Sequence, residues 1–207
     1  MSVVTCAAAV VYRAIGISLL IMATQVAAGP PDPPEQVIED VTAKMRHFLD
    51  RREATDSFEP SSNRRAIIEL VAPHFNFERL TRETMGDYWA DISGGERRCL
   101  TAGLRERLID RYTEYLLDFH YTSIETQPTP PIARAQSAYV TQRVTTASPE
   151  PLLLGFKLDF DGGAWKVTDL SVDGVSLVKS HAASFAEDIE REGIGDFLRS
   201  FPACRER

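Results

Sequence analysis

The hydrophobic pattern changes once along the chain, near residue 120. Between Glu96 and Phe119 the apolar residues recur every three or four positions, which is typical of a long amphipathic helix. Between Leu152 and Phe160 they alternate with other residues, as in a strand with one buried face. Helical patterns followed by alternating ones predict an α+β fold, with helices packed on an antiparallel sheet.

Further segments support this order of elements. Asp161-Gly162-Gly163 is a hairpin turn signal between two strands. We expect a single domain over 30–207, with N-terminal helices in 34–119, a sheet of about four strands in 121–172 and C-terminal helices in 176–201. The individual expectations are helices at 35–52, from Ser61 or Ser62 to 73, at 77–85, 96–119 and 176–192, a last apolar turn at 194–201, and strands at 133–145, 152–160 and 165–172.

The N-terminus has the layout of a secretory signal peptide. Arg13 precedes an apolar run from Ala14 to Ala23, and small residues follow at Val26-Ala27-Ala28-Gly29. The run is shorter than the ~20 residues that a membrane-spanning helix needs. We therefore expect residues 1–29 to be removed during export, with an uncleaved anchor as the alternative.

Composition and charge narrow the classes of function. A chain of 207 residues with 43% hydrophobic residues can bury a large core without metals. Its net charge of −7 argues against sequence-independent nucleic-acid binding, which needs Lys and Arg to neutralise phosphates. After export, Cys99 and Cys204 would meet an oxidising compartment, where they form a disulfide or remain separate thiols.

Motifs for catalysis are mostly missing. The four histidines do not have the spacing of a metal site, and neither a Gly-x-Ser-x-Gly elbow nor a phosphate-binding glycine loop occurs. Asp169 and Asp173 are the candidate acids for one alternative, a small-molecule enzyme on a cone-shaped α+β fold. A structural protein with a filled core and an exposed apolar patch is another alternative.

Three blocks, in order, resemble the MlaC (toluene-tolerance auxiliary) family. The segment 71–89 contains the "P-x-F-x-F" stretch at 73–77, followed by a short helix, Gly86 and the aromatic pair Tyr88-Trp89. Residues 165–170 are similar to the family's "W-x-V-x-D" block, and 173–178 to its "D-G-V-S-L" block. The resemblance covers Pro34 to about Phe201.

The resemblance implies a periplasmic carrier that is not an enzyme. Such proteins shuttle phospholipid between an outer-membrane lipoprotein–porin complex and an inner-membrane ABC transporter with an MCE-domain ring. The acyl tails enter an apolar pocket between a strongly curved sheet and its helices. The resemblance also implies a monomer without metal, cofactor or stable membrane insertion, since the bound lipid is cargo. A hopanoid or another lipid remains the alternative cargo.

On this reading, the expected lipid contacts come from the aromatic rim, the long helix, the sheet and the start of the last helix. Ser176 is the residue expected to meet a phosphate. The full set is Tyr88, Trp89, Leu104, Leu108, Tyr112, Leu116, Tyr139, Phe156, Leu158, Trp165, Val167 and Ser176.

Overall fold

The computed structural model describes residues 32–55, 60–117, 120–128 and 136–205. The predicted signal segment 1–29 lies outside these residues. The chain from Pro31 to Arg207 forms one compact unit. Its described elements run from helices through a sheet and back to helices, so the predicted α+β class is confirmed.

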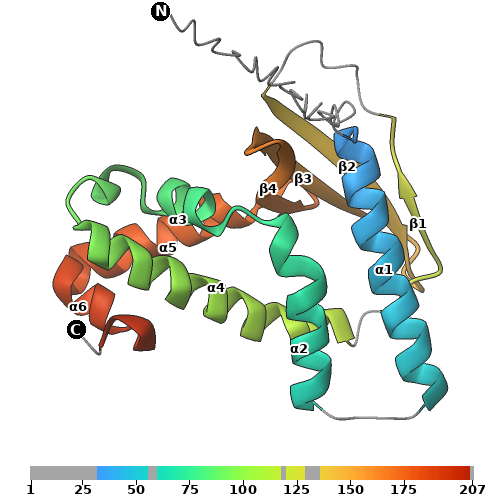
Figure 1. Cartoon of the computed structure of the whole chain (residues 1–207), viewed down its shortest axis with the longest axis horizontal. Helices are drawn as coiled ribbons and strands as arrows, with labels where there is room; N and C mark the ends of the chain where they lie inside the picture. Colours follow the sequence, from blue (N-terminus) through green and yellow to red (C-terminus); the bar gives the residue numbers. More distant parts are fainter. Residues whose placement is uncertain (1–31, 56–59, 118–119, 129–135, 206–207) are drawn as a thin grey trace, which may run out of the picture. The chain divides into compact units, whose positions relative to one another are not determined.

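Helix α1 lies beside the sheet, and α2 lies between α1 and α4 (Figure 1). Helix α1 spans Pro34–Thr55 and packs against strand β2, while α2, Pro60–Val71, contacts both α1 and α4. Helix α2 begins with Pro60, and proline suits a first helical position because it has no N–H to leave unpaired. The predicted caps Ser61 and Ser62 are therefore already inside the helix.

Two helices follow with well-defined starts. A short 3₁₀ turn, Ala72–His74, leads to α3, Phe77–Met85, which matches the predicted bounds. The Asn76 side chain caps α3 by accepting a hydrogen bond from the Arg79 N–H at 2.9 Å. After a second 3₁₀ turn, Gly86–Trp89, helix α4 spans Gly94–Leu117. Ser93 and Glu96 form a reciprocal capping box at its start, with N···O distances of 2.7 and 3.3 Å.

All neighbouring strands of the sheet are antiparallel, in the order β1-β2-β3-β4-β5. Their bounds are Ser123–Thr126, Ser137–Thr145, Leu152–Asp161, Ala164–Val172 and Val175–Ser176. The two-residue β5 makes five strands where about four were expected. Gly162 and Gly163 both have positive φ, 58° and 87°, as the predicted tight hairpin between β3 and β4 requires.

The chain ends in helices α5, Leu177–Glu192, and α6, Ile194–Arg199, and a 3₁₀ turn, Pro202–Cys204. A disulfide joins Cys99 in α4 to Cys204, which resolves the alternatives left open by the sequence. Helices α3, α4, α5 and α6 share one core, the helical core, around Leu100, Leu104, Phe185, Phe197 and Phe201. A smaller sheet core joins α1 to the sheet through Ile38, Ala138, Val140, Leu158 and Val167.

Candidate functional site

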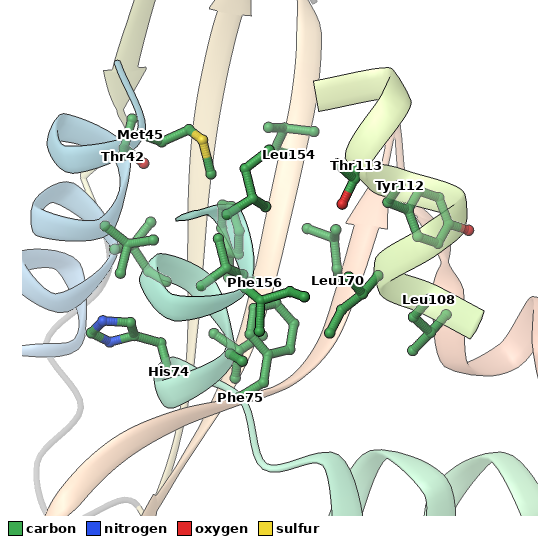
Figure 2. A pocket seen from close by; sticks show the side chains of 18 of the residues that line it. Thr42, Met45, His74, Phe75, Leu108, Tyr112, Thr113, Leu154, Phe156 and Leu170 are labelled. Carbon is green, nitrogen blue, oxygen red and sulfur yellow. The ribbon is translucent and has the colours of Figure 1, made fainter. Parts of the chain in front are cut away.

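A partly open cavity of about 250 Å³ lies between helices α1, α2 and α4 and the inner face of the sheet (Figure 2). The atoms that line it are almost all apolar. The lining residues are Ile38, Val41, Thr42, Met45, Arg46, Leu49, Ile67, Ile68, Val71, Ala72, His74, Phe75, Phe77, Leu80, Leu108, Ile109, Tyr112, Thr113, Tyr121, Ile124, Gln142, Leu154, Phe156, Val167, Leu170 and Leu177.

Helical spacing builds one wall of the cavity. On α1, the residues Ile38, Met45 and Leu49 recur at one or two turns and face the same side. On α4, Leu108 and Tyr112 are one turn apart in the C-terminal half of the helix, and both line the cavity. Each helix thus contributes part of its apolar stripe to the empty space and the rest to packed core.

An irregularity in the sheet builds the opposite wall. Phe156 pairs with Leu170 and Leu158 pairs with Val167, so the register shifts between Lys157 and Leu158. Such a β-bulge places one extra residue on β4. Val167 and Leu170 are three positions apart and would face opposite sides of a regular strand, yet both line the cavity because of this shift.

The segment before α3 closes one part of the cavity. The backbone N–H of Asn76 donates to the carbonyl of Val167 at 2.9 Å, and Phe75 forms an isolated bridge with Val167. The Phe75 ring, which Figure 2 shows beside Phe156, stacks on Phe77 with ring centroids 5.6 Å apart. This stretch is part of the "P-x-F-x-F" pattern, so the pattern fixes an apolar corner of the cavity.

A few polar side chains interrupt the apolar lining. The Thr42 hydroxyl donates to Oε1 of Gln142 at 3.1 Å, and Nε2 of Gln142 donates to the Thr126 hydroxyl at 3.3 Å. His74 is half-buried, and burial lowers the pKa of its imidazole below the ordinary 6.5, with Lys44 and Lys166 adding to the effect and Asp40 opposing it. The imidazole is therefore mostly neutral near pH 7.

Four of the predicted contact residues meet at the cavity. Leu108 and Tyr112 line it from α4, Phe156 from β3 and Val167 from β4. Their side chains come from segments that are far apart in the sequence, and the fold brings them together. Their contact with lipid itself stays a prediction.

The other predicted residues lie elsewhere. Leu104 is fully buried in the helical core, and Tyr88 and Trp89 pack against that core. Leu158 is buried in the sheet core, and Trp165 packs against it, with its ring 5.3 Å from that of Phe160. The side chain of Leu116 lies outside the described part of the structure.

Tyr139 and Ser176 have structural roles away from the cavity. Tyr139 is half-exposed on the outer face of the sheet, where its hydroxyl is 2.7 Å from that of Ser171. Ser176 caps α5 by accepting from the Lys179 N–H at 3.1 Å, and it donates to Asp169 at 2.5 Å. The structure does not bring these two residues to the cavity, and a lipid contact at either one stays a prediction.

Residues of α1 and α2 are the main part of the site that the sequence did not single out. Their apolar stripes are visible in the sequence, but a stripe at helical spacing is normally packed core. Leu154 and Leu170 were also missed. Leu170 was missed because the bulge on β4 leaves no mark on a simple alternating pattern.

The two candidate acids accept hydrogen bonds from nearby residues and so stabilise local structure. Asp169 accepts hydrogen bonds from the Ser176 hydroxyl and from the Val178 N–H, at 2.5 and 3.0 Å. Asp173 accepts a hydrogen bond from the Leu153 N–H at 2.9 Å. Its own backbone has a positive φ of 48°, as residues in tight turns often do. Neither aspartate lines the cavity. The described residues contain no group of three or more His, Cys, Asp or Glu placed to hold a metal ion.

Hydropathy adds one finding about the helices. Across the described ranges, no helix combines the length and the apolar character needed to cross a membrane.

Taken together, these features define an α+β protein whose helices and bulged sheet enclose an apolar cavity. A family model described as "MlaC protein" matches residues 39–201. The chain belongs to the MlaC family. A similar fold occurs in the phospholipid-binding protein from Ralstonia solanacearum, solved in complex with a phospholipid. That structure has a TM-score of 0.71 and 18% sequence identity, and the match covers 83% of this chain and 97% of the other.

Proposed function

We propose that this protein is a periplasmic phospholipid carrier that shelters acyl tails in the cavity between α1, α2, α4 and the sheet. The observation that carries the proposal is the cavity itself, which is almost wholly apolar and is partly open. The family and the phospholipid bound to the R. solanacearum protein support the same class of ligand.

The energetics suit a carrier without catalytic groups. The two tails of a phospholipid hold roughly thirty methylenes, and at ~0.8 kcal/mol each their transfer out of water gains roughly 24 kcal/mol. A free phospholipid in water is therefore strongly disfavoured. A bilayer offers nearly the same gain as the cavity, so exchange between the two is close to balanced.

The proposed compartment and partners rest on separate arguments. A signal-like N-terminus and the Cys99–Cys204 disulfide both favour an oxidising compartment outside the cytoplasm. Membership of the MlaC family supports transfer between an outer-membrane lipoprotein–porin complex and an inner-membrane ABC transporter with an MCE-domain ring. In this role the protein would act as a monomer.

The first experiment identifies the cargo. The full chain is exported to a bacterial periplasm, purified and extracted with organic solvent, and the extract is analysed by mass spectrometry. We expect near-stoichiometric phospholipid. A hopanoid would keep the carrier and change its cargo, whereas a lipid-free protein that also takes no lipid from vesicles would refute the proposal.

A matched pair of variants tests the location of the cargo. Leu154 lines the cavity, and its neighbour Leu153 is 39% exposed on the other face of β3. Leu154→Trp should fill part of the cavity and lower the bound lipid severalfold. Leu153→Trp adds the same side chain outside and should leave the bound lipid unchanged. Equal loading of both variants would place the cargo elsewhere.

A further inference from the structure

The charge distribution around the cavity is uneven. Among the lining residues that the structure describes, Arg46 is the one that carries a full positive charge at neutral pH, and none is a carboxylate. Arg46 is also the one lining residue that is exposed, while the others are buried or half-buried. Its side chain therefore marks a rim where the apolar lining meets water.

The Arg46 guanidinium has no acidic partner among the described residues. It lies over the ring of Tyr121, 5.6 Å from the ring centroid, and Tyr121 also lines the cavity. Two arginines away from the cavity do have acidic partners: Arg64 pairs with Asp110 at 2.5 Å, and Arg79 lies 3.0 Å from Glu83. A guanidinium held over an aromatic ring, with no acid beside it, keeps its N–H donors available for a planar or tetrahedral anion.

A second observation points to a ligand that is more than hydrocarbon. Thr113 is 6% exposed and lines the cavity, and its hydroxyl has no hydrogen-bond partner within the described part of the chain. Figure 2 shows the Thr113 oxygen on the cavity side of α4. A buried hydroxyl without a partner is costly, and an alkyl chain alone would leave it unpaired. An occupant with ester oxygens near its tails could accept a hydrogen bond from it.

We propose that the rim formed by Arg46 and Tyr121 binds the phosphate of a glycerophospholipid whose tails lie in the cavity. This inference rests on the proposed function and adds the headgroup site. The tails exclude water inside, and the phosphate stays at the boundary, where it can accept a charge-assisted, bidentate hydrogen bond from the guanidinium. The whole chain is acidic, with a net charge of −7, so this attraction is local rather than a property of the net charge.

The test compares two lipids that differ in the phosphate. Delipidated protein is mixed with vesicles of phosphatidylglycerol that contain a minor fraction of diacylglycerol with the same chains, and the ratio of the two bound lipids is measured. The wild type should favour phosphatidylglycerol relative to its share of the vesicle. Arg46→Gln should lower that preference about fivefold. The factor is modest because the ion pair between the Arg46 guanidinium and the lipid phosphate is solvent-exposed. Arg46→Lys should restore part of it, since the charge returns without the fork.

Arg143→Gln is the matched control. Arg143 is exposed on the outer face of β2, away from the cavity. Its substitution by Gln removes the same positive charge as Arg46→Gln. This variant should keep the wild-type preference.

Three outcomes would overturn the headgroup site. They are an Arg46→Gln protein with the wild-type preference, an equal loss of both lipids, and an equal change in Arg143→Gln. A wild type that takes up neither lipid would instead refute the carrier function, so the two failures are distinguishable.

Discussion

Gly103 lies in the middle of α4 and lets the ring of Phe201 approach the helix backbone. A Cβ added at this glycine would lie 2.9 Å from Cδ1 and 3.0 Å from Cβ of Phe201, which is fully buried. Alanine normally stabilises a helix interior by about 0.5–1 kcal/mol relative to glycine. Overpacking of a core costs about 1–3 kcal/mol, so the clash outweighs that gain.

We therefore expect Gly103→Ala to lower the free energy of unfolding by about 1 kcal/mol, as measured by urea denaturation. Gly195→Ala in α6 is the control. Its added Cβ would meet only the end of the Arg199 side chain, at 3.6 Å, so stability should be unchanged or slightly raised. A Gly103→Ala protein that is more stable than the wild type would contradict the packing argument.

Asp169 provides a second residue-level prediction. Its carboxylate accepts from the Ser176 hydroxyl and the Val178 N–H, and so ties β4 to the start of α5. Asp169→Ala should lower the free energy of unfolding by about 1–3 kcal/mol, since the Val178 N–H loses its acceptor. Lipid loading of the folded variant should be unchanged, because Asp169 does not line the cavity. Unchanged stability together with lost loading would favour a functional role for this acid.

At the scale of elements, the Cys99–Cys204 disulfide fastens the C-terminal turn to the first part of α4. The bridge closes a loop across a sequence separation of 105 residues, and cross-links of this kind typically contribute about 2–4 kcal/mol. Reduction should therefore lower the Tm by about 5–15 °C, as followed by circular dichroism.

Reduction should have little effect on the cavity. The α4 residues that line it, from Leu108 to Thr113, are two or more turns beyond Cys99. Lipid loading below the lowered Tm should then match that of the oxidised protein. The Cys99→Ala/Cys204→Ala variant is the control, because its Tm should not respond to reductant. A wild-type Tm that is equally insensitive would show that the bridge does not form.

At the scale of the whole molecule, two half-buried histidines couple stability to pH. Burial lowers the pKa of His181 below 6.5, and Arg111 and Arg107 add to the effect; burial likewise lowers the pKa of His74. The unfolded chain therefore binds protons more readily than the folded protein. Stability is fully present above about pH 7 and falls as the pH drops below 6.5 toward the folded pKa values.

Thermal denaturation at pH 7.5 and 5.5 tests whether stability falls as the pH is lowered. We expect a lower Tm at pH 5.5, and a smaller difference between the two pH values in His181→Gln, with a further reduction in His74→Gln/His181→Gln. All other titratable groups are the same in wild type and variants, so the comparison isolates the contribution of the histidines. An identical pH response in the double variant would show that these histidines do not carry the effect.

The molecule divides its apolar residues between packing and an unfilled space. Around α3, α5 and α6, aromatic side chains such as Phe185, Phe197 and Phe201 fill the helical core edge to face. Between α1, α2 and the sheet, the apolar side chains do not fill the space, and the cavity remains between them. The same kinds of stripe occur in both regions, so hydrophobic pattern alone does not distinguish them.

Interactions between residues close in the sequence determined much of the secondary structure, and the sequence alone predicted this part. The helical period predicted α3 with its observed bounds and most of α1 and α4, and the glycine pair 162–163 predicted the β3–β4 hairpin, because spacing and turn geometry depend on neighbouring residues. The family blocks indicated the MlaC fold. Tertiary structure decided the rest: the bulge that turns both Val167 and Leu170 inward, the packing of Tyr88 and Trp89 against core, and the placement of Arg46 at the rim. These depend on which faces meet across the fold, and a pattern along one strand or helix does not contain that information.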